Sequence, residues 1–330
     1  MPRLTRLPAP IVRPGANPLI ATPMCVALPE AGIPDGAPVI LVLPAMGTPA
    51  SFYQPLALQL CDLLQGPVAI GELPGQGASR MAARRGASFG YREIVDDCIP
   101  AYVEQLMGWF PERPLYIVGH SLGGQLAVLA LPRIHDSIAG LVLAACGTAH
   151  YRAWGRFRLK AMAMVYLVRF LALCLPWYPG RRLGFGGDQP RRLMRDWSVN
   201  ATTGRYSIAG DPMGPRGRQA VLDTVSLPVL ALCVSGDAVA PRRAAEELLS
   251  FIPSAQPTHC EIPGVPAHNP WRRHFSWVRE AAQASVAIAQ WLRGLPDNAE
   301  PVSRTDSHDS PILPARRQAA DSRLPEAAGR

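Results

Sequence analysis

The first 17 residues lack the continuous apolar core of a signal peptide. Four prolines interrupt this stretch, at Pro2, Pro8, Pro10 and Pro14. A secretory signal needs an apolar run of about 7–15 residues. The sequence therefore does not predict secretion, and we expect a cytoplasmic protein.

The sequence also lacks the cysteine pattern of a disulfide or zinc framework. It has seven cysteines, an odd number, and no C-x-x-C pair among them. Most lie inside apolar runs, where thiols pack as small buried side chains in a reducing compartment. We therefore predict neither a disulfide framework nor a metal site. The cysteines are Cys25, Cys61, Cys98, Cys146, Cys174, Cys233 and Cys260.

No nucleic-acid-binding motif accompanies the net charge of +8. Between Tyr151 and Ala220 there are thirteen Arg and Lys against three Asp, so the basicity belongs to one segment. Because no aromatic stacking pattern is interleaved with these charges, they predict contact with an anionic lipid surface or an anionic substrate rather than with nucleic acid. The alternative is a solvated helical layer whose arginines keep the protein soluble.

The most informative stretch runs from Tyr116 to Gly124, where an apolar, strand-like run meets the pattern G-x-S-x-G and then a helical run. This is the context of a nucleophile elbow, which holds a serine in a strained, exposed turn. Gly119 and Gly123 carry no side chain where strand and helix come close. Ser121 is the candidate nucleophile, and the Leu122 N–H can point at a developing oxyanion. The alternative is a tight turn without chemistry.

Apolar runs alternate with segments of helical periodicity, which predicts an α/β fold with a mostly parallel sheet flanked by helices. At 330 residues and 48% hydrophobic content, one large domain with an insertion fits better than two independent domains. We place an N-terminal extension at residues 1–18, the core at 19–150 and 224–295, a mainly helical cap insertion at 151–223 and a disordered tail at 296–330. The strands expected outside the elbow are Leu19 to Thr22, Met24 to Leu28, Pro38 to Leu43, Val68 to Ile70, Ile138 to Ala145, Leu227 to Val234 and Thr258 to Ile262.

The inserted segment contains a strongly apolar run from Leu159 to Leu175. Lys160 and Arg169 interrupt it, so its uninterrupted core is shorter than the roughly 20 residues that span a bilayer. We predict a helix buried within the cap. The alternative is a helix that lies in a membrane interface and gives the basic cap a weak peripheral membrane contact.

A candidate acid and three histidines lie in the second core segment, residues 224–295. Asp237 stands in the loop after the next strand, whereas the strand before the insertion ends without a carboxylate. Asp237 is therefore the candidate orienting acid, and the alternative is a loop aspartate that caps the following helix. Of the histidines, His259 lies within an expected strand and is assigned a structural role, which leaves His268 and His274 as candidate bases.

With Ser121, Asp237 and a late histidine in this order, the chain resembles the α/β-hydrolase superfamily over about residues 19 to 295. A narrower resemblance is to bacterial α/β hydrolases labelled serine-aminopeptidase-like or lysophospholipase-like. It implies the α/β-hydrolase fold and favours His274 as the base, with His268 as the alternative. The resemblance rests on Pro44-Ala45-Met46-Gly47, Pro179-Gly180-Arg181-Arg182-Leu183-Gly184, Arg195-Asp196-Trp197 and His274-Phe275-Ser276-Trp277.

The resemblance implies a serine hydrolase in which Ser121 attacks, the histidine takes its proton and Asp237 orients the histidine. The oxyanion hole should combine the Leu122 N–H with that of Met46, or alternatively that of Ala45. We expect hydrolysis of a small-molecule carboxylic ester or thioester through an acyl-serine intermediate, without metal or organic cofactor. The basic cap would suit an anionic substrate such as an acyl-CoA or a lysophospholipid.

Three alternatives to an ester or thioester hydrolase stay open at this level. One is an aminopeptidase, although a peptide's free amine normally needs acidic residues near the site and the segment from Tyr151 to Ala220 has only three. Another is a perhydrolase or haloperoxidase-type enzyme with the same triad. The third is a catalytically silent ligand-binding protein. A serine at the elbow argues against a haloalkane dehalogenase or epoxide hydrolase, which need an aspartate there.

Overall fold

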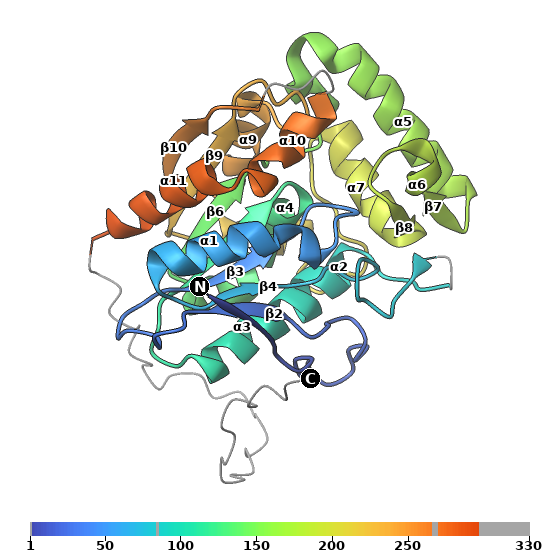
Figure 1. The fold of residues 1–330 in the computed structure, drawn as a ribbon. Coiled ribbons are helices and arrows are strands. Elements are labelled where there is room, and N and C mark those ends of the chain that lie inside the picture. Colours follow the sequence, from blue (N-terminus) through green and yellow to red (C-terminus); the bar gives the residue numbers. More distant parts are fainter. Residues whose placement is uncertain (1, 84–85, 266–269, 297–330) are drawn as a thin grey trace.

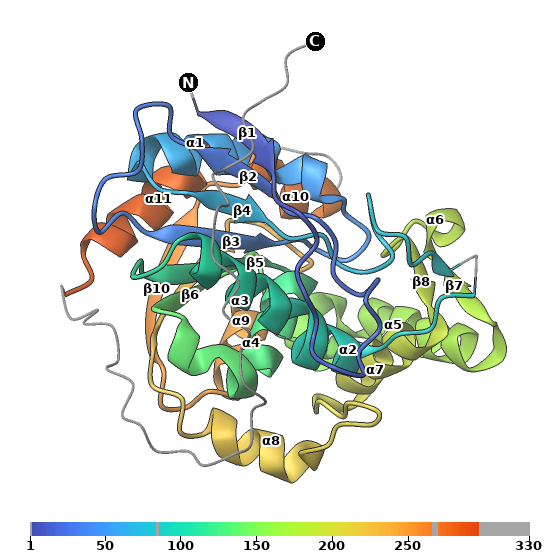
Figure 2. The same ribbon diagram turned by 90° about the horizontal axis from the view of Figure 1, so that it is seen from below.

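The computed structural model describes residues 2–83, 86–265 and 270–296. Within these residues, eight strands form one sheet in the order β1-β2-β4-β3-β5-β6-β9-β10 (Figures 1 and 2). β2 is antiparallel to both of its neighbours and the remaining pairs are parallel, which confirms the predicted mostly parallel sheet. The strands are β1 Arg3–Arg6, β2 Cys25–Leu28, β3 Val39–Leu43, β4 Val68–Ile70, β5 Leu115–His120, β6 Gly140–Ala144, β9 Pro228–Val234 and β10 Gln256–Ile262.

Two predictions for the N-terminal region are wrong. Residues 3–6 were expected in an extension outside the core, but they form the edge strand β1 and pair with β2. Two of these four residues are arginines, and the mostly exposed side chains show no apolar alternation. The strand is held in the sheet by its backbone pairing with β2 rather than by side-chain burial. Leu19 to Thr22 is not a strand, since the Ile20 N–H closes a turn onto the Asn17 carbonyl oxygen at 3.0 Å.

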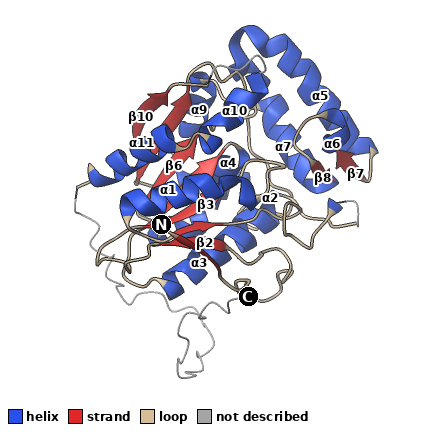
Figure 3. Ribbon diagram, in the orientation of Figure 1, coloured by secondary structure: helices blue, strands red, loops and turns tan. Residues whose placement is uncertain are grey.

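Helices cover both faces of the sheet (Figures 2 and 3). Alternate residues of β3 point to opposite layers, as in any strand: Leu41 packs in the layer of α3, α4 and α9, whereas Ile40 and Val42 pack in the layer of α1, α10 and α11. Between Tyr91 and Trp109 the chain forms α2, a π-helical turn at Ile94–Cys98, and α3. The helices are α1 Gln54–Leu64, α2 Tyr91–Glu93, α3 Ile99–Trp109, α4 Leu122–Ile134, α9 Arg242–Leu249, α10 Pro270–Arg279 and α11 Ala282–Arg293.

The chain between the neighbouring strands β6 and β9 leaves the sheet and forms a separate, mainly helical layer (Figure 1). Its outermost helix, α5, buries only one stripe, made by Ala161, Val165, Val168 and Ala172 and packed against α7. The prediction of a buried helix is therefore right for one face of α5 only. No helix in the described ranges is both long enough and apolar enough to cross a bilayer. The elements are α5 Arg158–Cys174, β7 Trp177–Pro179, α6 Gly180–Leu183, β8 Asp188–Pro190, α7 Arg191–Thr203 and α8 Gly214–Leu222.

One buried arginine fastens α8 to the body of the fold. The Arg218 guanidinium donates to Asp211 Oδ2 (2.7 Å), to Asp96 Oδ1 in the π-helical turn (2.9 Å) and to the Leu129 carbonyl oxygen of α4 (2.6 Å). Burial raises the pKa of Asp211, but the hydrogen bonds from Arg218 outweigh burial and lower this pKa overall. Arg218 thus neutralises two carboxylates that are almost fully buried.

Replacing Arg218 by leucine is expected to lower the free energy of unfolding by about 3–5 kcal/mol, because it removes the paired cation of buried Asp211 and leaves buried Asp96 with only its longer contact to Arg133, at 3.3 Å. Urea unfolding at neutral pH measures this loss. Arg216→Leu, at an exposed position of the same helix, should change stability by no more than about 0.5 kcal/mol. Equal losses in the two variants would contradict the assignment.

The same contact has an expected pH dependence. The folded-state pKa of Asp211 is depressed, so its stabilisation is complete above the unfolded-state pKa of about 4. It is lost as the pH falls through the folded-state pKa. The difference in stability between wild type and Arg218→Leu should therefore shrink on acidification.

Candidate active site

Ser121 stands at the turn between β5 and α4 in a conformation that non-glycine residues rarely adopt, with φ 52° and ψ −117°. The turn is tight on both sides. A Cβ on Gly119 would lie 2.4 Å from the Gly124 Cα, and one on Gly123 would lie 2.3 Å from the Leu43 carbonyl oxygen. These approaches explain both glycines and confirm the predicted strained elbow. They also bring the start of α4 against the loop that follows β3.

Asp237 and His274 meet although 37 positions separate them. Asp237 Oδ2 and His274 Nδ1 are 2.7 Å apart, and both side chains are buried. The other carboxylate oxygen accepts the backbone N–H groups of Val239 (2.8 Å) and Ala240 (3.3 Å). Asp237 therefore turns its own loop and contacts the histidine ring at the same time. It does not cap the following helix, because the N-cap of α9, Pro241, has no side-chain capping hydrogen bond.

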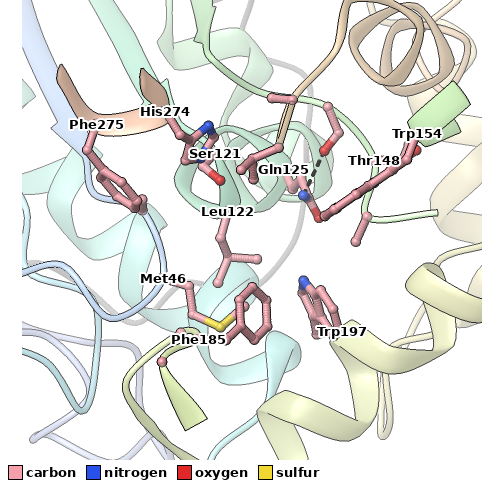
Figure 4. Close-up of a pocket in the computed structure, with 17 residues that line it drawn as sticks. Met46, Ser121, Leu122, Gln125, Thr148, Trp154, Phe185, Trp197, His274 and Phe275 are labelled. Carbon is pink, nitrogen blue, oxygen red and sulfur yellow. Dashed lines mark hydrogen bonds between the residues drawn. The ribbon is translucent and has the colours of Figure 1, made fainter. Parts of the chain in front are cut away.

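The three histidines considered from the sequence, His259, His268 and His274, lie in different places. His274 lies inside helix α10. Its ring lines the same cavity as Ser121 (Figure 4). His259 is exposed on the edge strand β10, as expected of a residue in a strand. His268 lies outside the described residues.

A buried chain of hydrogen bonds connects the loop after β3 with the backbone of α10. The Ala45 N–H donates to the Tyr53 hydroxyl oxygen (2.8 Å), and this hydroxyl lies 2.7 Å from His120 Nδ1. His120 Nε2 is 3.0 Å from the His274 carbonyl oxygen. A carbonyl only accepts, so Nε2 carries the proton and Nδ1 accepts from Tyr53.

The side chains of Tyr53 and His120 stay in the protonation states that these hydrogen bonds require. Burial, and next the charge of the neighbouring His274, hold the pKa of His120 well below its usual value, so the ring is neutral. Burial also raises the pKa of Tyr53, which therefore keeps its proton. The His120 ring packs beside the His274 ring, with the two ring centroids 4.8 Å apart. The role of Tyr53 was missed, because nothing in the sequence connects it with His120 across 67 positions.

The loop after β3 offers one free backbone donor near the serine. The Ala45 N–H is occupied by Tyr53, whereas the Met46 N–H has no hydrogen bond within the described part of the chain. The Leu122 N–H belongs to the first turn of α4, where backbone donors have no partner in the helix. Met46 and Leu122 both line the cavity with Ser121. This arrangement favours Met46 over Ala45 as the second oxyanion donor.

The cavity beside Ser121 has a volume of about 160 Å³ and mostly apolar walls. Two of its polar atoms, Thr148 Oγ1 and Trp154 Nε1, are buried without a partner among the described residues. Gln125 is already bonded to the Gly147 carbonyl oxygen at 2.7 Å (Figure 4). The lining residues are Ala45, Met46, Ser121, Leu122, Gln125, Gly147, Thr148, Ala149, Trp154, Gly184, Phe185, Gly186, Trp197, Val239, Ala240, His274 and Phe275.

None of these described lining residues is Asp, Glu, Arg or Lys. Residues 2–83, 86–265 and 270–296 also contain no group of three or more His, Cys, Asp or Glu side chains placed to hold a metal ion. The arrangement can position a serine hydroxyl, a histidine and a carboxylate at one end of an apolar cavity. The sequence had pointed to this cluster, but not to the apolar walls made by Trp154, Phe185 and Trp197.

Comparison with known proteins agrees with this architecture. The family model described as "Serine aminopeptidase, S33" matches residues 36–213, more than half of the chain. A search among curated protein sequences finds none that matches.

Solved structures resemble the chain in fold. A soluble variant of monoglyceride lipase from Saccharomyces cerevisiae has a TM-score of 0.60 at 14% identity, covering 87% of this chain and 96% of its own. The monoacylglycerol lipase of Paleococcus ferrophilus has a TM-score of 0.51 at 17% identity, with 88% and 98% covered. A haloalkane dehalogenase variant from Bradyrhizobium elkanii has 0.52 at 16% identity, with 89% and 97% covered. Since these neighbours differ in chemistry, the likeness concerns the fold, and activity must be argued from the site.

Proposed function

Because the chain belongs to the serine aminopeptidase S33 family of α/β hydrolases, we propose that it hydrolyses carboxylic esters or thioesters of small acyl substrates through an acyl-serine intermediate. Both the resemblance and the α/β-hydrolase fold predicted from the sequence are confirmed by this membership. The observation that carries the proposal is the buried contact of 2.7 Å between Asp237 and His274, at the cavity that also contains Ser121.

The proposed reaction has two halves. In the first, Ser121 Oγ attacks the acyl carbon while His274 Nε2 takes the hydroxyl proton, and Asp237 stabilises the imidazolium that forms. The proton then passes to the departing alkoxide or thiolate. In the second, His274 takes a proton from water, the hydroxide attacks the acyl carbon and Ser121 leaves with that proton. The N–H groups of Leu122 and Met46 stabilise the oxyanion in both halves.

An acyl substrate suits the cavity better than a peptide does. The family's description names an aminopeptidase, and such an enzyme must hold a free ammonium group. The described cavity walls contain no carboxylate. They offer apolar surface to an acyl chain, and Thr148 Oγ1 and Trp154 Nε1 can bond a polar atom of the substrate. We also propose that residues 151–223 act as a cap over Ser121, since Trp154, Phe185 and Trp197 from this segment line the cavity.

A turnover panel tests the proposed function. It compares p-nitrophenyl esters of rising chain length, acyl-CoAs, lysophospholipids and aminoacyl anilides. We expect kcat/KM for the best ester or thioester to exceed that for any aminoacyl anilide by at least about 100-fold, because a buried ammonium without a partner is strongly disfavoured. Preference for an anilide would instead establish the aminopeptidase alternative.

Tyr53 is expected to act as a positioning residue for this reaction. Tyr53→Phe removes the acceptor of the Ala45 N–H and the donor to His120. The loop that carries Met46 then loses its anchor, so kcat should fall by about 10- to 100-fold with little change in KM. Steady-state kinetics on a short p-nitrophenyl ester measure both constants.

The control for Tyr53→Phe is Tyr116→Phe. Tyr116 lies on β5, and no hydrogen bond of its hydroxyl occurs among the described residues. This variant should keep wild-type kcat and KM. A parallel rise of KM and fall of kcat in Tyr53→Phe, or no change at all, would count against a role in positioning the loop.

A further inference from the structure

The outer face of α5 and α6 is an exposed apolar surface. Seven of the twelve large apolar side chains that are exposed among the described residues lie between positions 157 and 183, and the two most exposed of these, Leu159 and Phe170, are 66% and 61% accessible. On α5 they follow helical spacing and form one stripe opposite the buried stripe. We call this surface the outer face; its residues are Phe157, Leu159, Tyr166, Leu167, Phe170, Leu173 and Leu183.

Cations flank the outer face along the sequence, and the first acid after residue 150 is Asp188, which pairs with Arg181. Residues 151–187 contain seven Arg and Lys and no Asp or Glu. Arg158 and Lys160 are exposed in the first turn of α5, where the helix dipole disfavours positive charge. None of the described residues that line the cavity of Ser121 is Arg or Lys. These cations are therefore placed for something outside the molecule rather than for a substrate inside the cavity.

A second cavity lies beside the outer face. It has a volume of about 200 Å³ and is lined by apolar side chains, among them Leu167 and Leu183 of the outer face. It shares Gly184 and Phe185 with the cavity that contains Ser121. The two cavities therefore adjoin at Gly184 and Phe185. The outer face combines an exposed apolar stripe with nearby cations, and an anionic lipid surface matches both features.

We propose that the outer face docks on an anionic lipid bilayer. Leu159, Tyr166 and Phe170 enter the boundary between headgroups and acyl chains, and the surrounding Arg and Lys side chains contact lipid phosphates. An amphipathic helix with a cationic rim binds anionic membranes in this way. The position of α5 and α6 at the periphery, away from the sheet, leaves this face open (Figure 1). The proposal does not depend on ester hydrolysis.

The test is co-sedimentation of the full chain with vesicles, in the Ser121→Ala background so that no lipid is turned over. The protein should bind phosphatidylcholine vesicles that contain phosphatidylglycerol and should be released by salt. Leu159→Glu/Phe170→Glu should lower the partition coefficient at least about 10-fold, because each apolar side chain that no longer enters the boundary weakens binding by several fold. Lys160→Gln should lower it about 5-fold.

The matched control is Val286→Glu, which also places a carboxylate at an exposed apolar position, on α11. It should bind vesicles like the parent, and circular dichroism verifies that all variants are folded. The proposal is overturned if the parent does not bind phosphatidylglycerol vesicles, if it binds pure phosphatidylcholine equally well, or if Leu159→Glu/Phe170→Glu binds like the parent. The parent could instead fail to bind vesicles and form a dimer in light scattering, with Leu159→Glu/Phe170→Glu monomeric. That result would identify a second copy of the chain as the occupant of the outer face.

Discussion

Replacing Ser121 by alanine is expected to lower ester turnover by about 10⁴- to 10⁶-fold, with little change in fold. The hydroxyl oxygen is the atom that forms the acyl bond in the proposed reaction, and no neighbour can replace it. Cys146 is the nearest nucleophilic alternative, with Sγ 3.0 Å from the Ser121 carbonyl oxygen. Burial raises the pKa of the Cys146 thiol, so it stays protonated and unreactive.

Labelling with a fluorophosphonate probe separates chemistry from folding in this test. Wild type should be labelled and Ser121→Ala should not, whereas Ser250→Ala, at an exposed position just after α9, should be labelled like wild type. Absence of labelling in well-folded wild type would favour the catalytically silent alternative. Labelling that persists in Ser121→Ala would place the nucleophile elsewhere.

The same position also permits a stability measurement. Ser121→Ala keeps a Cβ at φ 52°, whereas Ser121→Gly removes it and relieves the backbone strain. The glycine variant should therefore be more stable than the alanine variant by about 1 kcal/mol. Such a difference would show that the elbow stores strain in order to expose its serine.

The parts of the site that are local in sequence could be predicted, and those that depend on distant contacts could not. The elbow was predictable because strand, glycines, serine and helix are contiguous and their steric requirement is intrinsic. Asp237 was predictable because the ends of parallel strands meet at one edge of the sheet. The bond from Tyr53 to His120 was not, because it depends on how the 3-10 turn Ala50–Tyr53 meets the end of β5.

The fold shows the same division. Buried strands such as β3 and β5 can be recognised in the sequence by their continuous apolar runs. The edge strand Arg3–Arg6 has no such run and is defined by its pairing with β2. For α5, composition predicted a helix but not which side faces solvent, because the buried stripe is set by contact with α7. The exposed side is the one that carries the docking proposal.

The second large effect is expected from the base. His274→Ala should lower kcat by about 10⁴- to 10⁶-fold, because Ser121 then has no partner that accepts its proton. Asp237→Asn should cost about 10⁴-fold, since the amide cannot stabilise the imidazolium and favours the wrong tautomer of His274. Single-turnover measurements with a p-nitrophenyl ester report the acylation step directly, and added imidazole should partly restore turnover in His274→Ala but not in Ser121→Ala.

His268→Ala is the decisive comparison, because sequence reasoning left both histidines open. His274 has the 2.7 Å contact with Asp237, and a carboxylate that already accepts two backbone N–H groups on its other oxygen has one oxygen left to orient a single imidazole. We therefore expect His268→Ala to keep kcat within about 10-fold of wild type. If His268→Ala abolishes turnover while His274→Ala preserves it, the base is His268 and the Asp237–His274 pair is structural. Loss of turnover in both variants, with imidazole rescue confined to His274→Ala, would still assign the proton transfer to His274.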